Sequence, residues 1–521
     1  MQSVMTNRFS QVPRAEIPRS AFKRNHGYKT TFDAGYLVPI FVDEALPGDT
    51  MNLDMSAFAR LATPLHPFMD NLHVDTFFFA VPLRLVWENW ERFNGAQDNP
   101  TDTTDYLIPQ VSPPAGGYTT GSLDDYFGLP VGVENFTHSA LWHRAYNLIW
   151  NEWFRDENLQ QSQPVPINDG PDDPTNFKLM RRGKRHDYFT SCLPWPQKGP
   201  AVELPLGDQA PITGFGQVTN PDIAAGVTIR ETGGTDNATT GWAPNTGGYA
   251  MAEDPNNTGY PAIYADLSNA TAATINAIRE AFQIQKLYER DARGGTRYIE
   301  ILKSHFGVTS PDARLQRPEY LGGGSSNVNI NPIAQTSETS TESPQANLAA
   351  VGTMGINRHG FTKSFVEHCV VIGMISARAD LTYREGLERM WSRRTRWDFY
   401  WPALAHIGEQ AVLNKEIYTQ GTADDDNAFG YQERFAEYRY KPSRITGQFR
   451  SEFAQSLDTW HLSQDFAQLP VLNDTFIEEN PPVDRVIAIP TYPHFLLDTY
   501  FSLNHVRPMP ANSVPGYIDH F

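Results

Sequence analysis

Apolar runs of strand length lie near both ends of this chain. The clearest is Asn71–Val81, where Leu72, Val74, Thr76 and Phe78 share one face of a predicted strand. Four further segments read as strands: Tyr36–Val42, Phe365–Tyr383, Arg485–Ile489 and Phe495–Val506. Strands so far apart must pair non-locally. The pattern therefore predicts a mainly β fold of the Greek-key sandwich or jelly-roll kind.

Helical spacing is confined to the middle of the chain. It predicts helices over Trp87–Phe93, Ser139–Asn151, Ala272–Arg293 and Thr296–Phe306. The glycine-rich stretch Leu321–Ser326 reads as flexible, and the polar run Asn327–Asn347 that follows it is poor in helix signals. The helices therefore read as insertions in a β scaffold.

One connection differs from the others in length and composition. From Ala201 to Ser268 the chain is built largely from Gly, Pro, Asn, Thr and Asp, and its only Lys or Arg is Arg230. Long irregular segments within compact domains are usually functional or disordered. A polar, turn-rich insertion of this kind is tolerated at a surface. We therefore expect a surface loop here.

Charge is distributed unevenly. The 521 residues carry a net charge of −18, yet the first thirty hold six cations against the single Glu16, a local net of +5 that leaves −23 for the rest. An acidic body repels DNA, so any contact with nucleic acid needs a local patch. The basic segment predicts an extended arm whose candidate DNA-contacting residues are Arg8, Arg14, Arg19, Lys23, Arg24 and Lys29.

Two further basic patches are interleaved with aromatic residues. They are Lys178–Lys198, which includes Arg181, Arg182 and Trp195, and Arg389–Arg396, flanked by Trp397. Cations beside aromatic rings suit single-stranded nucleic acid. Salt bridges between subunits and packing over the core explain the same residues, and both readings stay open.

Catalytic and cofactor motifs are missing. The chain has no phosphate-binding loop, no HExxH and no GxSxG, and the GxG at Gly214 does not continue into a dinucleotide fingerprint. His66, His73 and His143 are widely spaced, and Cys192 and Cys369 form no metal-binding pair. We expect no metal, no cofactor and no catalytic residue.

Targeting signals are missing as well. The first residues lack the apolar core of a secretory signal, and the longest apolar runs are far shorter than the roughly 20 residues that span a bilayer. Two lone cysteines suit a reducing cytoplasm. We therefore expect no membrane insertion.

Ordered blocks of sequence strongly resemble the major capsid protein of the gokushoviruses, a branch of the Microviridae, which are small single-stranded-DNA bacteriophages. The longest block is PLHPFMDNLHVDTFFFAVPLRLVWENW at 64–90. The others are DYFTSCLPWPQKG at 187–199, GGTRYIEILKSHFG at 294–307, RLQRPEYLGG at 314–323, GYQERFAEYR at 430–439 and LDTWH at 457–461. They are spread over most of the chain outside 201–268.

The resemblance implies a fold, an assembly and a set of partners. It implies an eight-stranded antiparallel jelly roll with long loop and helical insertions, built through pentamers into a T=1 icosahedral shell around a circular single-stranded DNA genome. It implies an internal scaffolding protein, a small basic DNA-binding protein, a DNA pilot protein and a host surface receptor as partners. It also implies assembly in the cytoplasm of a bacterial host and residence in the virion.

These expectations divide the chain into a basic arm, 1–30, and one capsid domain, 31–521, in which the insertion from Ala201 to Ser268 forms a surface protrusion. In the family such an insertion lies at the three-fold axes and contacts the host; buttressing the three-fold contact is the alternative. A jelly-roll carbohydrate-active enzyme or a lectin is the rival function, and neither explains the ordered blocks.

Overall fold

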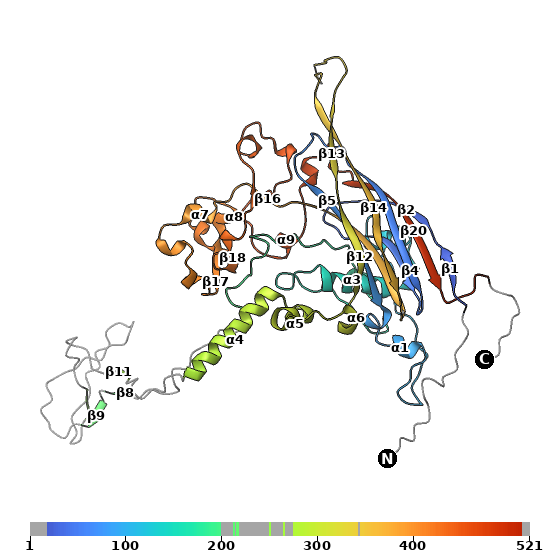
Figure 1. Cartoon of the computed structure of the whole chain (residues 1–521), viewed down its shortest axis with the longest axis horizontal. Helices are drawn as coiled ribbons and strands as arrows, with labels where there is room; N and C mark the ends of the chain where they lie inside the picture. The colour runs from blue at the N-terminus through green and yellow to red at the C-terminus, as the bar shows by residue number, and fades with distance from the viewer. Residues whose placement is uncertain are drawn as a thin grey trace. The chain divides into compact units, whose positions relative to one another are not determined.

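The computed structural model describes residues 18–199, 212–213, 215–217, 249–251, 264–265, 275–341 and 344–512 (Figure 1). The chain divides into two compact units. Unit 1 comprises Met1–Pro196 and Gly294–Phe521, and unit 2 comprises Gln197–Arg293. In the described part of the chain, no helix has both the length and the apolar character needed to cross a bilayer.

Unit 1 is built on two antiparallel sheets. The first has the order β2–β20–β4–β14, with β1 also on β20 and β13 beyond β14; the second has the order β12–β5–β15–β3. Their bounds are β1 Ser20–Lys23, β2 His26–Phe32, β3 Val38–Ala45, β4 Thr50–Leu61, β5 Leu72–Pro82, β12 Glu319–Asn327, β13 Asn329–Ala334, β14 Leu348–Ser364, β15 Cys369–Ala379 and β20 Phe495–Arg507.

The strand order is that of a jelly roll. Counting β1 with β2 and β12 with β13 as single bent strands gives eight, and strands adjacent in sequence fall repeatedly in opposite sheets. The expectation of a mainly β jelly roll with insertions is confirmed. Because β20 pairs with β2 in the first sheet, strands from distant parts of the sequence lie side by side.

Alternation along the strands builds the core between the sheets. In β4 the apolar residues Met51, Leu53 and Met55 are buried while the residues between them face outward. They pack with Phe78 of β5 and with residues of β20 in one continuous cluster. This period of two is what a sheet with one buried face requires.

Strand β15 is buried on both faces. Val371, Ile375 and Ala377 join the core between the sheets, whereas Val370, Ile372 and Met374 face a second cluster. Helix α3 (Leu141–Trp153) covers that outer face with Tyr146, Ile149 and Trp150. A strand covered on both sides reads as a continuous apolar run, which is why its sequence signal is strong.

Two long insertions carry the remaining elements. The connection from β5 to β12 holds α1 (Trp90–Phe93), β6 (Gln110–Val111), α2 (Leu123–Tyr126), β7 (His138–Ser139), α3, α5 (Tyr298–Phe306) and α6 (Asp312–Leu315). The connection from β15 to β20 holds β16 (Thr382–Tyr383), α7 (Arg389–Ser392), β17 (Glu409–Leu413), α8 (Asn414–Ile417), β18 (Ala428–Glu433), β19 (Ser443–Arg444) and α9 (Asp474–Ile477). A third core of Tyr188, Val412 and Phe476 supports this second insertion.

Unit 2 holds the helix α4 (Ile275–Gly294) and four short strands. The strands are β8 (Ile212–Thr213), β9 (Phe215–Gln217), β10 (Tyr249–Met251) and β11 (Tyr264–Ala265), which pair as β9 with β10 and β8 with β11. The four predicted helices are confirmed with shifted ends.

Two predicted elements are wrong. Arg485–Ile489 is not a strand, because Val483–Arg485 forms a turn of 3₁₀ helix and Ile487 makes only an isolated bridge to Pro64. Leu321–Ser326 is not a flexible stretch, because it lies within β12 and pairs with β5. The polar run Asn327–Asn347 contains β13, an edge strand whose side chains are mostly exposed.

Candidate functional site

The predicted basic arm divides at the start of the sheet. Arg8 and Arg14 lie outside the described residues. From Ser20 onward the segment forms β1 and β2, both hydrogen-bonded to β20. Arg19 donates a 2.7 Å hydrogen bond to the carbonyl oxygen of Gly48. This part of the arm is anchored to the jelly roll.

Arg24 belongs to an intramolecular ion-pair network. Its guanidinium lies 2.6 Å from a carboxylate oxygen of Asp43 and 3.0 Å from Nδ1 of His505. Nε2 of His505 lies 2.8 Å from Asp49, a carboxylate that Arg507 also contacts at 3.0 Å. Burial lowers the pKa of His505. Arg24 therefore ties the arm to the last strand.

Lys29 and Lys23 are more available to an outside partner. Lys29 pairs with Asp498 at 3.0 Å, but both side chains are exposed, and exposed pairs are worth roughly 0–1 kcal/mol. Lys23 is exposed, and among the described residues its side chain forms no ion pair. Of the arm cations that the structure describes, Lys23 is the one least committed to the fold.

Several cations of the patch Lys178–Lys198 make contacts within unit 1. Arg182 forms a 2.6 Å ion pair with the buried Asp75, and Arg181 stacks on the ring of Tyr36 while donating to two backbone carbonyls. Burial lowers the pKa of Lys184 to about 8, and its ammonium lies 4.6 Å from the centre of the Phe476 ring. These cations support the packing of unit 1.

The patch Arg389–Arg396 borders a cavity of about 170 Å³. Arg389 lies 3.0 Å from Glu416, which also accepts a 2.8 Å hydrogen bond from the Tyr188 hydroxyl; Arg393 lies 3.4 Å from Glu437. Burial raises the pKa of Glu416. Arg389 and Arg393 of this patch are thus each paired with a carboxylate of the same chain.

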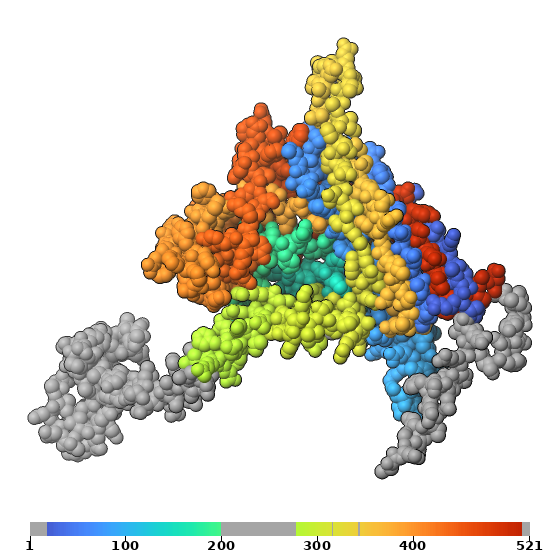
Figure 2. Space-filling view, viewed as in Figure 1, coloured from blue at the N-terminus to red at the C-terminus, as the bar shows by residue number. Residues whose placement is uncertain are grey.

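Exposed aromatic side chains surround this patch. The segment containing them, orange in Figure 2, lies at the surface of unit 1. They are Trp391, Trp397, Phe399, Tyr400, Trp401 and Tyr438, each about half or more exposed. Contiguous exposed apolar surface marks sites of protein contact. The structure therefore gives the aromatic residues of this patch a surface to offer to another protein.

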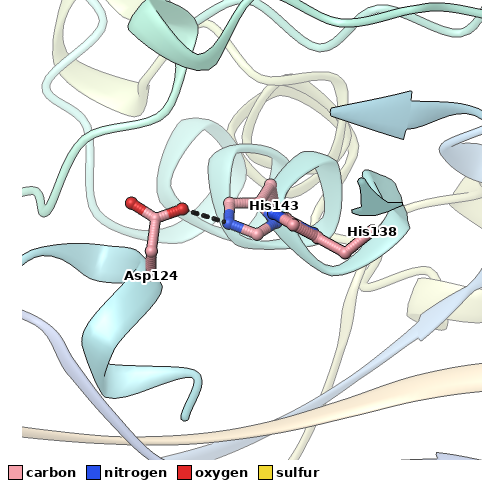
Figure 3. A group of neighbouring side chains, drawn as sticks. All are labelled: Asp124, His138 and His143. Atoms are coloured by element: carbon pink, nitrogen blue, oxygen red, sulfur yellow. Dashed lines mark hydrogen bonds and ion pairs between the residues drawn. The ribbon is translucent and has the colours of Figure 1, made fainter. Parts of the chain in front are cut away.

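Asp124, His138 and His143 form a cluster that the sequence did not reveal (Figure 3). One ligand-type atom from each lies within 4.8 Å of the others. No known metal-ligand spacing relates Asp124 and His138 to His143, so the sequence predicts no cluster here. The available signal was that His138 and His143 flank the start of a predicted helix. His66 and His73 are not part of this cluster, and the expectation that His143 binds no metal ion stays a prediction.

The predicted protrusion is described only in part. Its end residues, Ala201 and Ser268, lie outside the described residues. The strands β8 to β11 fall within its bounds, and all four belong to unit 2. The bounds of the insertion therefore fall within unit 2.

Comparison with known proteins gives consistent matches over the whole chain. The family model described as "Capsid protein (F protein)" matches residues 10–517. The "Capsid protein VP1" of Bdellovibrio phage phiMH2K is 53% identical over 524 residues, covering 98% of both chains. The VP1 proteins of Chlamydia phage 1 and Spiroplasma virus 4 are 47% and 38% identical, covering 97–99% of each chain.

Fold and relatives therefore agree. The jelly-roll order of the sheets is one that viral capsid proteins use. Proteins of this family are structural, so neither the comparisons nor the fold supports the rival enzyme or lectin. The chain belongs to the capsid (F protein) family of phages, and within it to the gokushovirus major capsid proteins, which are components of the virion.

Proposed function

We propose that this subunit assembles through pentamers into a T=1 icosahedral shell around a circular single-stranded DNA genome. The observation that carries this proposal is the full-length match to capsid proteins together with the eight-strand jelly roll. The exposed aromatic residues around Arg389–Arg396 are suited to contacts between neighbouring subunits. Symmetric closure makes many modest contacts collectively stable.

The partners are those that the family resemblance implies, and the charge of the chain supports one of them. A chain with a net charge of −18 leaves most of the genome's charge unneutralised. A small basic DNA-binding protein supplies the missing cations, an internal scaffolding protein guides assembly, and a DNA pilot protein accompanies the genome. These three partners belong to the proposal.

The arm contributes the subunit's own DNA contact through the cations that the fold does not use. Lys23 is the described arm cation that the fold does not use, since Arg24 is held by Asp43 and His505. Arg8 and Arg14, which lie outside the described residues, join it in the proposal. Replacing all three with Ala should leave the subunit folded and reduce DNA content per particle, measured by absorbance at 260 and 280 nm. Arg24→Ala is the control, because it removes an arm cation that Asp43 and His505 already hold. Unchanged DNA content in the triple variant contradicts the arm's role.

The insertion from Ala201 to Ser268 contacts the host in this proposal. Support comes from its polar, turn-rich sequence and from its position within unit 2, a compact unit of its own. Replacing 201–268 with a short Gly/Ser linker should give particles of normal yield that no longer adsorb to host cells. Adsorption equal to that of the parent refutes the receptor role. Loss of particles, with the subunit still folded, assigns the loop to the three-fold contact instead.

A further inference from the structure

The cluster around His143 lies in the insertion between β5 and β12. Asp124 is in α2, whose first turn is capped by Ser122; His138 is in β7; and His143 is in the first turn of α3. Figure 3 shows the ring of His143 between Asp124 on one side and His138 on the other. Three separate elements therefore deliver polar side chains to one place.

The hydrogen bonds fix the tautomer of His143. Its Nε2 lies 2.9 Å from Oδ1 of Asp124, and an ionised carboxylate can only accept, so the ring proton is on Nε2. Nδ1 then carries a lone pair. That atom is buried without a hydrogen-bond partner, in a residue only 2% exposed. Buried polar atoms without partners are uncommon, and each one calls for an explanation.

The partners of His138 fix its tautomer in the same way. Its Nδ1 lies 3.1 Å from the carbonyl oxygen of Ser139, which can only accept, so the proton is on Nδ1. Its Nε2 lone pair accepts from the Tyr118 hydroxyl at 2.7 Å.

The two imidazoles thus offer two nitrogen lone pairs from rings whose centroids are 5.1 Å apart. Each ring donates its other N–H to an oxygen, His143 to a carboxylate and His138 to a backbone carbonyl. That arrangement is how proteins orient histidine ligands of metal ions. Neutral imidazole nitrogens select zinc, copper and nickel over calcium or magnesium.

We propose that His138 and His143 bind a divalent transition-metal ion of the Zn²⁺ class inside each subunit, with Asp124 as the positioning residue that orients His143. The ion takes the Nδ1 lone pair of His143 and replaces the Tyr118 hydroxyl proton on Nε2 of His138. It links α2, β7 and α3, and so fastens the insertion that covers the outer face of β15. Water completes the coordination.

Metal binding by the purified full-length subunit, carrying no histidine tag, tests the proposal. After treatment with EDTA and dialysis, Zn²⁺ is titrated in competition with a chromogenic chelator, and bound metal is measured by mass spectrometry. One ion per chain is expected. His138→Gln should weaken binding at least a hundredfold, and Asp124→Asn by roughly 10–100-fold because only orientation is lost. Tyr118→Phe should bind as tightly as the parent or more tightly.

A matched control separates this site from other buried histidines. His494 is also buried and lies 2.9 Å from a carboxylate of Asp484, but no second imidazole lies against it in the described structure. His494→Gln should bind Zn²⁺ like the parent. As a second readout, Co²⁺ should give visible d–d bands in the parent and in Tyr118→Phe but not in His138→Gln. The proposal is overturned if the parent binds no Zn²⁺, or if His138→Gln binds it as tightly as His494→Gln does.

Discussion

At the scale of residues, the interior of unit 1 holds a fully buried arginine by pairing it with a carboxylate and with backbone carbonyls. Arg144 is fully buried and donates to both carboxylate oxygens of Asp172, at 2.6 and 2.7 Å, and to the carbonyls of Val86 and Asn168 at 2.9 Å each. Arg144 lies on α3, the helix that covers the outer face of β15. Removing one partner leaves an uncompensated buried charge, which is far more costly than losing an exposed pair.

Arg144→Met should therefore destabilise the subunit by roughly 3–5 kcal/mol. Lys29→Met, which removes the exposed pair with Asp498, should cost less than about 1 kcal/mol. Urea unfolding of the unassembled subunit, followed by tryptophan fluorescence, measures both. Equal midpoints for the two variants would show that the buried pair is not a stabilising contact.

Buried histidines make stability depend on pH. Burial lowers the pKa values of His359, His461 and His505 below their ordinary value. The unfolded chain takes up protons near pH 6.5, before the folded chain does, so stability is greatest above that pH and is lost as the pH falls through the folded pKa values.

The melting temperature of the subunit should therefore fall between pH 7 and pH 5. His461→Gln should make that fall shallower, because Nε2 of His461, held 2.9 Å from the carbonyl of Phe449, no longer titrates. His406→Gln, at an exposed histidine, should leave the slope unchanged. Calorimetry at several pH values measures the slopes, and identical slopes for parent and His461→Gln would contradict the assignment.

Residue contacts of this kind were the least predictable from the sequence. Arg144 pairs with Asp172, and His143 with Asp124, only because the insertion folds back over α3. The cations of the arm illustrate the same limit, since nothing in the local sequence shows that Arg24 meets His505 at the far end of the chain. Charge composition located the basic segment, and the fold decided which of its charges are free.

At the scale of elements, the doubly buried β15 and the alternating β20 were predicted, whereas two other alternating strands, β4 and β14, were missed. Strand β15 is buried on both faces and stood out. Strand β4 was not predicted, because Asn52, Asp54 and Ser56 form a polar face and give its sequence a composition typical of loops. Strand β14 is also an alternating strand and was missed for the same reason.

The glycine-rich strand β12 was wrongly predicted as a flexible stretch for a different reason. A side chain at Gly324 would lie 2.5 Å from the His359 ring, and one at Gly322 would lie 2.5 Å from a backbone oxygen of β14. Gly323 has a φ of +153°, which L side chains rarely adopt. These glycines permit a close approach of strands, so a composition typical of a flexible linker here serves tight packing.

Gly373 offers a direct test of that packing in β15. A Cβ at this position would lie 2.6 Å from the ring of Phe78 and 2.9 Å from Phe41. Gly373→Ala should destabilise the subunit by roughly 1–3 kcal/mol through overpacking. Gly355→Ala in β14, where no atom lies within 4 Å of the added carbon, is the matched control and should be close to neutral. Urea midpoints measure the difference, and a neutral Gly373→Ala would mean that Phe41 and Phe78, its neighbours on the flanking strands, can move aside without cost.

At the scale of the whole molecule, topology came from the position of the strands and function from the ordered sequence blocks. Strands at both ends of the chain predicted non-local pairing, and β2 does pair with β20. Length and composition alone did not separate a capsid protein from a jelly-roll enzyme or lectin. The full-length relatives, 38–53% identical, made that distinction.

The central claim is that this chain forms a shell through the jelly roll described above. Cryo-electron microscopy of particles purified from cells that express it tests this most directly. The account predicts T=1 icosahedral particles in whose map β2–β20–β4–β14 faces β12–β5–β15–β3 in every subunit. A folded subunit that stays monomeric at every concentration, or a map in which these strands are ordered differently, would contradict it.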